Sequence, residues 1–314
     1  MLPAKADFIS IINSNNSFGV QGMNEAPNPY NILVPIDFSG FCRKALPVAQ
    51  ELARIYKGRI SPLHVYDLYS DMEGFHYDVD SFHADGDPAS IAQAIKEKLR
   101  RFVSEAVGTD FLADSVTEQN SNTAQAIADA SERFDLVVMS SHGRAGFMRM
   151  LMGSTTEKVL RLGNRPIVIV EDEEAFTPFR KILVPTDFSL NSFAALPYAH
   201  DIALATGAEV HLFHALCGDF SKPEQFERQK QERLAKLHEV AEQHLPGLAG
   251  NLKFFVVHGA DSAHNAIREH IIEQHYNLVV MATAGRTGLD HLRIGSTTAT
   301  LIRSVHTTFM AIKP

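Results

Sequence analysis

The chain contains nearly the same sequence twice. Residues 31–39, NILVPIDFS, return as KILVPTDFS at 181–189, and SSHGRAGFMRMLMGSTT (140–156) returns as ATAGRTGLDHLRIGSTT (282–298). A repeat of roughly 150 residues has the length of a whole domain and is too long for a solenoid unit. The sequence therefore predicts one domain duplicated, so that a site found in one copy can be checked in the other.

The two copies keep their spacing at both ends and differ in the middle. His64 matches His214 at an offset of 150 residues, whereas Gly153 matches Gly295 at an offset of 142. The first copy therefore carries eight more residues. We place them in the segment 67–88, where turn formers and acidic residues interrupt any apolar period.

Composition limits the class of protein. The 314 residues suffice for two domains of about 140 residues each, enough to bury an adequate core. A formal net charge of -8 and the lack of a Lys/Arg run argue against a general nucleic-acid binder. No apolar stretch is long enough to span a bilayer, so no membrane partner is expected.

The opening segment and the cysteines favour the cytoplasm. Residues 1–19 lack the features of a secretory signal, and residues 1–29 as a whole are expected to be a turn-rich extension without a counterpart in the second copy. The two cysteines, Cys42 and Cys217, occupy non-equivalent positions, so a disulfide framework is not expected.

Each copy alternates strands and helices. The strands are nearly uniformly apolar, which indicates a parallel sheet covered by helices. The predicted fold is α/β, with two tandem open parallel five-stranded sheets that carry helices on both faces, a Rossmann-like arrangement. In the first copy strands are expected at 31–37, 59–67, 113–119, 135–140 and 165–172, and helices at 39–57, 90–108, 123–134 and 154–163. The predicted domains are 30–172 and 180–314, joined by an acidic linker at 173–179.

Two details of the helices carry expectations of their own. Pro47 lies inside the first helix, and Pro197 repeats it; each should kink or restart its helix, because proline removes an amide donor. The helix at 154–163 is expected to have Ser or Thr at its N-cap and Gly at its end.

Two loops leave strand ends with unusual sequence. Asp-Phe-Ser follows the first strand at 37–39 and 187–189, and the fourth strand leads through a glycine and nine further residues to Gly-Ser-Thr at 153–155 and 295–297. Ligands of open parallel sheets lie beyond the carboxyl ends of the strands. Free N–H groups at a helix start favour an anion, so a phosphate chain is the natural occupant. The alternative, tight turns and a simple helix cap, is disfavoured because both copies keep identical spacing.

Familiar nucleotide-binding motifs are absent from these loops. No G-x-x-x-x-G-K-[ST] occurs, so the chain is not a P-loop protein. The first strand is followed by Asp-Phe-Ser rather than G-x-G-x-x-G, so the chain is not a dinucleotide-binding dehydrogenase.

With these motifs the chain resembles a tandem universal stress protein over about 30–314. The ATP-binding branch of that family has G-x2-G-x9-G-[ST] after strand four, Asp at the end of strand one and Val after His in strand two. The last two glycines and the Ser match at Gly143, Gly153 and Ser154, and at Gly285, Gly295 and Ser296; the Asp matches at Asp37 and Asp187. The resemblance implies an adenine nucleotide alpha hydrolase-like fold. It also implies that the Asp and the strand-two residue contact adenine, while the glycines and Ser hold ribose and phosphates.

The resemblance yields one set of candidate cofactor-binding residues in each copy. In the first copy these are Pro35, Ile36, Asp37, Ser39, Val65, Met139, Ser140, His142, Gly143, Arg144, Gly153, Ser154 and Thr155. In the second they are Pro185, Thr186, Asp187, Ser189, Ala215, Met281, Ala282, Gly285, Arg286, Gly295, Ser296 and Thr297.

The two sets depart from the family motif in different ways. Its first glycine is Ser140 in one copy and Ala282 in the other, which adds a Cβ where ribose or phosphate approaches. The strand-two residue is Val65 or Ala215. The turn after strand three contains a glycine, at Gly259, only in the second copy. The sequence therefore predicts two related sites of unequal affinity.

Metal chemistry and catalysis find less support. The 15 histidines show no zinc spacing, and His211 and His214, three apart on a strand, point to opposite faces. His64 and His214 repeat, which a packing role at the strand end explains equally well. Arg144 and Arg286 could reach phosphates or be solvated. A nucleotide hydrolase needs a positioned water and usually a metal held by acids, and we find no second acidic residue tied to the loop.

We therefore expect a cytoplasmic stress-response regulator that binds ATP or another adenine nucleotide in one or both copies, with Mg²⁺ as a candidate ion at the phosphates. The resemblance implies an internal pseudo-dimer with the final strands, 165–172 and 307–312, at its junction; a further homodimer is left open. The alternatives are a scaffold of the same fold that binds no nucleotide, and a slow ATP hydrolase.

Overall fold

The computed structural model describes residues 30–67, 88–142, 152–171, 178–220, 222–259, 261–285 and 294–314. The predicted extension 1–29, most of the predicted linker, and the site candidates Gly143, Arg144 and Arg286 lie outside the described residues. In the first copy the elements are β1 (Asn31–Pro35), α2 (Gly40–Ile55), β2 (Arg59–Tyr66), α4 (Pro88–Val107), β3 (Val116–Gln119), α5 (Thr123–Ser131), β4 (Leu136–Ser140), α6 (Ser154–Leu162) and β5 (Ile167–Val170).

The second copy repeats this order with two additions. Its elements are β6 (Lys181–Pro185), α7 (Leu190–Phe193), α8 (Leu196–Thr206), β7 (Glu209–Leu216), α9 (Pro223–His244), η2 (Ala249–Asn251), β8 (Leu252–His258), α10 (Ala263–Gln274), β9 (Leu278–Ala282), α11 (Ser296–Ser304) and β10 (Thr308–Ile312). The alternating α/β order predicted from the apolar strands is confirmed. Among the described residues no helix combines the length and the apolar character that a bilayer crossing requires.

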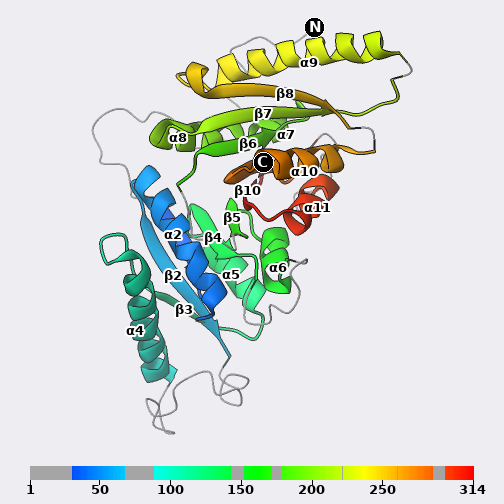
Figure 1. Ribbon diagram of the computed structural model, residues 1–314. Coiled ribbons are helices and arrows are strands. Elements are labelled where there is room, and N and C mark those ends of the chain that lie inside the picture. Colours follow the sequence, from blue (N-terminus) through cyan, green and yellow to red (C-terminus); the bar gives the residue numbers. More distant parts are fainter. Residues whose placement is uncertain are drawn as a thin grey trace.

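The ten strands form one continuous sheet. Its order is β3-β2-β1-β4-β5-β10-β9-β6-β7-β8, and the strands of each copy run parallel to one another (Figure 1). The copies meet at β5 and β10, which pair antiparallel with Val168 opposite Met310. The final strands thus lie at the junction, as expected. The two five-stranded sheets, however, are halves of a single mixed sheet rather than separate sheets.

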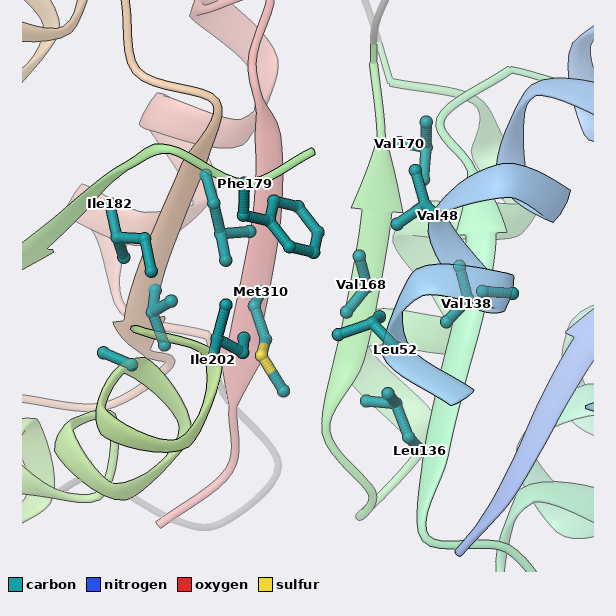
Figure 2. Close-up of a cluster of buried hydrophobic side chains, with 14 of the residues drawn as sticks. Val48, Leu52, Leu136, Val138, Val168, Val170, Phe179, Ile182, Ile202 and Met310 are labelled. Atoms are coloured by element: carbon teal, nitrogen blue, oxygen red, sulfur yellow. The ribbon is translucent and has the colours of Figure 1, made fainter. Parts of the chain in front are cut away.

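Both copies contribute to the hydrophobic layer on each face of this sheet. On one face, α2 of the first copy and α8 of the second pack over the junction, where Leu52, Val168, Ile202 and Met310 belong to one buried cluster (Figure 2). The layer on the other face lies under α5, α6, α10 and α11 and also joins the copies. The core is therefore shared between the halves.

The repeated Leu-Pro has different outcomes in the two copies. Helix α2 runs through Pro47 as one element. In the second copy α7 ends at Phe193, and α8 starts at Leu196 with Pro197 in its first turn, where a missing N–H costs nothing. The predicted restart is thus confirmed only in the second copy.

The extra length of the first copy lies between β2 and α4. That connection spans residues 67–87, whereas the connection from β7 to α9 spans only 217–222. This agrees with the position chosen from the sequence. Residues 68–87 themselves lie outside the described part of the chain.

The shared core leads to a prediction about cooperativity. Met310 is fully buried where the two halves meet, so Met310→Ala should lower the free energy of unfolding by about 2 to 5 kcal/mol. Because both layers cross the junction, guanidinium unfolding should remain a single transition. The control is Leu204→Ala on the exposed side of α8, which should change stability by no more than about 0.5 kcal/mol. Two separate transitions, only one of them shifted by Met310→Ala, would contradict a shared core.

Candidate functional site

The Asp-Phe-Ser turn after β1 fixes the orientation of a carboxylate. Asp37 Oδ1 accepts hydrogen bonds from the Ser39 backbone N–H (2.9 Å) and from Ser39 Oγ (2.6 Å). Ser39 Oγ in turn accepts from the Cys42 N–H (3.2 Å) and caps α2. One serine thus starts the helix and holds the aspartate at the carboxyl end of β1.

The second copy builds the same turn after β6. Asp187 Oδ1 accepts from the Ser189 N–H (2.9 Å) and Oγ (2.5 Å), and Ser189 Oγ accepts from the Ser192 N–H (3.1 Å). Thr186 adds contacts that Ile36 cannot make: its hydroxyl accepts from the Phe188 N–H (3.0 Å) and lies 2.8 Å from Ser192 Oγ. The second turn is therefore held by more hydrogen bonds.

A histidine supports each turn from the neighbouring strand. Phe38 and Phe188 both have φ of 62°, the left-handed region that bulky side chains seldom adopt. The buried rings of His64 and His214 lie 4.9 and 4.5 Å from these phenylalanine rings, centroid to centroid.

The same histidines donate hydrogen bonds to the turns. Nδ1 of His64 lies 2.7 Å from the carbonyl oxygen of Ile36, and Nδ1 of His214 lies 2.8 Å from that of Thr186. Since a carbonyl only accepts, Nδ1 carries the proton in both rings. The supporting role at the strand end, left open by the sequence, is the one the structure shows.

The strand-two candidates lie at the same end of the sheet as the aspartates. The register that pairs Pro35 with Leu63 puts Val65 level with Asp37. In the same way, the pairing of Pro185 with Phe213 puts Ala215 level with Asp187. Val65 and Ala215 are both half-buried, so each copy has an apolar side chain at the strand end that carries its aspartate turn.

The helix after the glycine loop begins at Ser154, as expected, but its N-cap residue differs from the prediction. Gly153, not Ser or Thr, is the N-cap of α6, and as a glycine it has no side chain with which to cap the helix. The Gly153 N–H donates to the Ser141 carbonyl (2.8 Å), and a Cβ on Gly153 would lie 2.8 Å from that oxygen. Only glycine fits this close approach. Gly163 ends the helix as predicted.

The second copy repeats this uncapped helix start. Gly295 is the N-cap of α11, again without a side-chain cap; its N–H donates to the Thr283 carbonyl (2.6 Å), which a Cβ would approach to 3.1 Å. Thr156 and Thr298 donate to the last carbonyls of β4 and β9, those of Ser140 and Ala282, both at 3.0 Å. Each threonine therefore ties its helix to the end of the strand.

The two loops touch each other in the second copy. A Cβ on Gly285 would lie 2.7 Å from Asp187 Oδ2, and Asn191 Nδ2 donates to the Gly285 carbonyl (3.2 Å). The structure thus brings the aspartate and the motif glycine together at one edge of the sheet.

The first copy differs at the equivalent positions. Phe41 stands where the second copy has Asn191, and its ring, 42% exposed, lies 6.2 Å from the ring of His142. His142 Nδ1 is bonded to Ser141 Oγ (2.7 Å), while Nε2 is buried without a hydrogen-bond partner among the described residues. Such an orphaned nitrogen suits a site that gains a polar ligand.

The remaining candidates lie at the same sheet edges. Ile36 and Met139 are buried at strand ends, and Ser140 turns its hydroxyl to the His142 carbonyl (2.7 Å). Met281 and Ala282 end β9; Ser154 and Thr155 begin α6, and Ser296 and Thr297 begin α11.

The strands within each copy run parallel, but β5 of the first copy and β10 of the second pair antiparallel. All strands of the first copy therefore end on one side of the sheet, and all strands of the second copy end on the opposite side. The candidate site of the first copy and that of the second therefore lie at opposite edges of the ten-stranded sheet (Figure 1).

Comparison with known proteins decides the family. The universal stress protein family matches the sequence twice, over residues 30–171 and 178–313. The chain belongs to the universal stress protein family. A universal stress protein of Mycolicibacterium smegmatis is 25% identical over 308 residues, which cover 93% of this chain and 100% of the relative. One from Methanocaldococcus jannaschii is 24% identical over 45% of this chain and 93% of its own length.

Solved structures share the fold across both halves. A universal stress protein from Archaeoglobus fulgidus superimposes with a TM-score of 0.64 at 22% identity, covering 90% of this chain and 98% of that one. A protein from Pseudomonas aeruginosa PAO1, described as functionally unknown, gives 0.62 at 17% identity, covering 91% and 93%. These likenesses show a tandem universal stress protein fold.

Metal ligands do not gather in the described part of this universal stress protein. Within it, no group of three or more His, Cys, Asp or Glu residues could hold an ion. His211 and His214 face opposite sides of the sheet, as expected: His211 contacts Phe255, and His214 contacts Phe188.

The supporting histidines lead to a stability prediction. His64→Leu removes the donor to the buried Ile36 carbonyl, so the free energy of unfolding should fall by about 1 to 3 kcal/mol. His64→Asn, whose amide nitrogen lies close to the Nδ1 position, should recover most of that loss. Guanidinium unfolding at neutral pH measures both variants. Equal stability of His64→Leu and the wild type would show that the histidine does not hold the turn.

Proposed function

We propose that this universal stress protein binds an adenine nucleotide, ATP in the first instance, at the strand-end loops of one or both domains, 30–172 and 180–314. It would act as a cytoplasmic regulator rather than a dedicated catalyst. In this proposal adenine lies against Asp37 and Val65, or against Asp187 and Ala215. The phosphates lie at the N-termini of α6 and α11.

One observation carries the proposal. The aspartate turn and the start of the helix that follows the glycine loop lie at the same end of the parallel strands. In the second copy Gly285 lies against Asp187, and the same loop leads to the start of α11, where the N-cap Gly295 has no side chain to cap the N–H groups. Such helix ends attract phosphate through free N–H groups and the helix dipole. The short distances at Gly153 and Gly285, to the Ser141 carbonyl and to Asp187 Oδ2, show that glycine is needed to pack these loops against the strand ends.

The two sites are proposed to have unequal affinity. The second turn has extra hydrogen bonds at Thr186, and Asn191 fixes Gly285 over Asp187. The first copy has Phe41 and the orphaned His142 nitrogen instead. Any Mg²⁺ would arrive with the phosphates and be held by them.

A charge placed at the helix start tests the proposal. Ser154 and Ser296 are exposed first residues of α6 and α11. Ser154→Asp and Ser296→Asp should keep the fold, because an acid near a helix N-terminus is favourable. Each should weaken ATP binding at its own site by about tenfold or more, since one lost charge-assisted contact costs about 1.5 to 3 kcal/mol. Titration calorimetry with ATP and AMP measures the affinities.

Gly250→Asp is the matched control. It adds the same charge where a Cβ meets nothing within 4 Å, in the turn before β8, and should leave binding unchanged. Freshly purified protein should also release nucleotide on denaturation, detectable by chromatography. The binding proposal fails if no nucleotide is released and millimolar ATP and AMP give no heat. Steady ADP production above background would favour a hydrolase.

A further inference from the structure

A chain of buried polar side chains runs under α10 in the second copy. His211 Nδ1 lies 2.6 Å from Tyr276 Oη, which lies 2.8 Å from His270 Nε2. All three side chains are buried, and the rings of Phe213 and Phe255 pack against His270 at 4.8 and 4.6 Å. The nucleotide-binding proposal makes no use of this chain.

Charged groups surround the chain from the neighbouring elements. At its outer end Glu209 on β7 pairs with His211 Nε2 and, at 2.7 Å, with Lys253 Nζ on β8. On β6, Lys181 Nζ lies 5.2 Å from the centre of the Tyr276 ring and donates to the Gln274 carbonyl at 2.8 Å. On α11, which packs against α10, Arg303 is paired with Glu157; on α10 itself Glu269 and Glu273 are exposed.

When both histidines are neutral, the Glu209 carboxylate sets the direction of each hydrogen bond between the four side chains. Ionised Glu209 can only accept, so His211 Nε2 carries a proton and Nδ1 is an acceptor. The Tyr276 hydroxyl therefore donates to His211, and its oxygen accepts from His270 Nε2–H. In this arrangement the Tyr276 hydroxyl has both an acceptor, His211, and a donor, His270.

This arrangement can take up one proton but not two. A proton on His211 Nδ1 reverses the Tyr276 hydroxyl, which then donates to His270 Nε2; for this the neutral His270 ring must hold its own proton on Nδ1 instead of Nε2. The charge on His211 is balanced by Glu209. A second proton, on His270, makes both rings donors to Tyr276, so the hydroxyl proton loses its acceptor. It also places a second buried cation near Lys181, which is costly.

The first copy has no counterpart of this series of hydrogen-bonded side chains. At the offsets of the repeat, Ser61, Ala128 and Phe134 stand at the positions of His211, His270 and Tyr276. The corresponding helix, α5, thus packs without titratable groups at these three positions. It is an internal reference for α10 within the same molecule.

We propose that the Glu209–His211–Tyr276–His270 chain is an acid-sensitive latch that holds α10 on the sheet at neutral pH and releases it when both histidines are protonated. The latch responds to protons through the second domain alone. It goes beyond nucleotide binding and does not depend on it.

The electrostatics agree with this geometry. Burial lowers the pKa of His270 from its ordinary 6.5 to about 4, with help from His211 and Lys181. Burial also lowers the pKa of His211, although Glu209 opposes it. Burial disfavours ionisation of Glu209, but hydrogen bonds from Lys253 and His211 outweigh it and lower the carboxyl pKa. A histidine with a depressed pKa stabilises the fold above its unfolded pKa, and this contribution is lost as the pH falls toward about 4.

Hydrogen exchange of the full-length protein tests the latch. Mass spectrometry measures the protection of backbone amides near pH 7.5 and near pH 4.5, and the intrinsic exchange rates at the two pH values are corrected for. Acidification should lower the protection of α10 amides about tenfold more than that of α5. His270→Gln keeps an amide donor near Nε2 and cannot be protonated. It should retain α10 protection at neutral pH and abolish the extra loss in acid. An equal acid-dependent loss in His270→Gln and wild type would overturn the proposal.

Two further measurements test the latch. Tyr276→Phe removes the central hydroxyl and should reduce α10 protection already at neutral pH; unchanged protection would overturn the latch. Titration of the His270 ring followed by NMR should have its midpoint below about pH 5. A midpoint near the ordinary histidine value would equally overturn it.

Discussion

The antiparallel pairing of β5 with β10 is the contact on which the rest of the structure depends. Five parallel strands alone would leave the backbone groups of β5 unpaired at an exposed edge, which proteins avoid. The pairing closes that edge in both copies and lets the hydrophobic layers on the two faces run across the junction. The halves therefore share their core: Val168 of the first and Met310 of the second are both fully buried and belong to one hydrophobic cluster.

Much of this fold could be predicted from the sequence, because buried parallel strands are apolar on both faces and the duplication shows each element twice. What could not be predicted depends on neighbours in space. The same Leu-Pro leaves α2 whole and separates α7 from α8. A Ser or Thr was expected to cap α6, but the N-cap is Gly153, which lies so close to the Ser141 carbonyl that a Cβ would not fit. That two sheets would be continuous follows from strand pairing between residues more than a hundred positions apart.

In the candidate site, too, some features could be predicted from the sequence and others could not. The aspartates and glycines stand out in the sequence because they recur with fixed spacing, and the structure brings Asp187 and Gly285 into contact. The repeated histidines were visible, yet their bonds to the turn carbonyls were not, because a strand position alone does not show which carbonyl a ring faces. His211 and Tyr276, 65 residues apart, have no local signal; single histidines in the sequence are here linked through a tyrosine.

Joining the two copies in one polypeptide removes a restriction that a pair of identical subunits would face. In a dimer of identical chains, every substitution appears on both sides of the symmetry axis, so a feature useful on one side is imposed on the other. Here one half can carry Asn191 and the hydrogen-bonded side chains of His211, Tyr276 and His270, while the other keeps Phe41 and a helix contact without titratable groups at those three positions. Because the two halves are covalently linked, each can take on different residues and a different role, although both keep the same fold and are related by a pseudo-twofold arrangement.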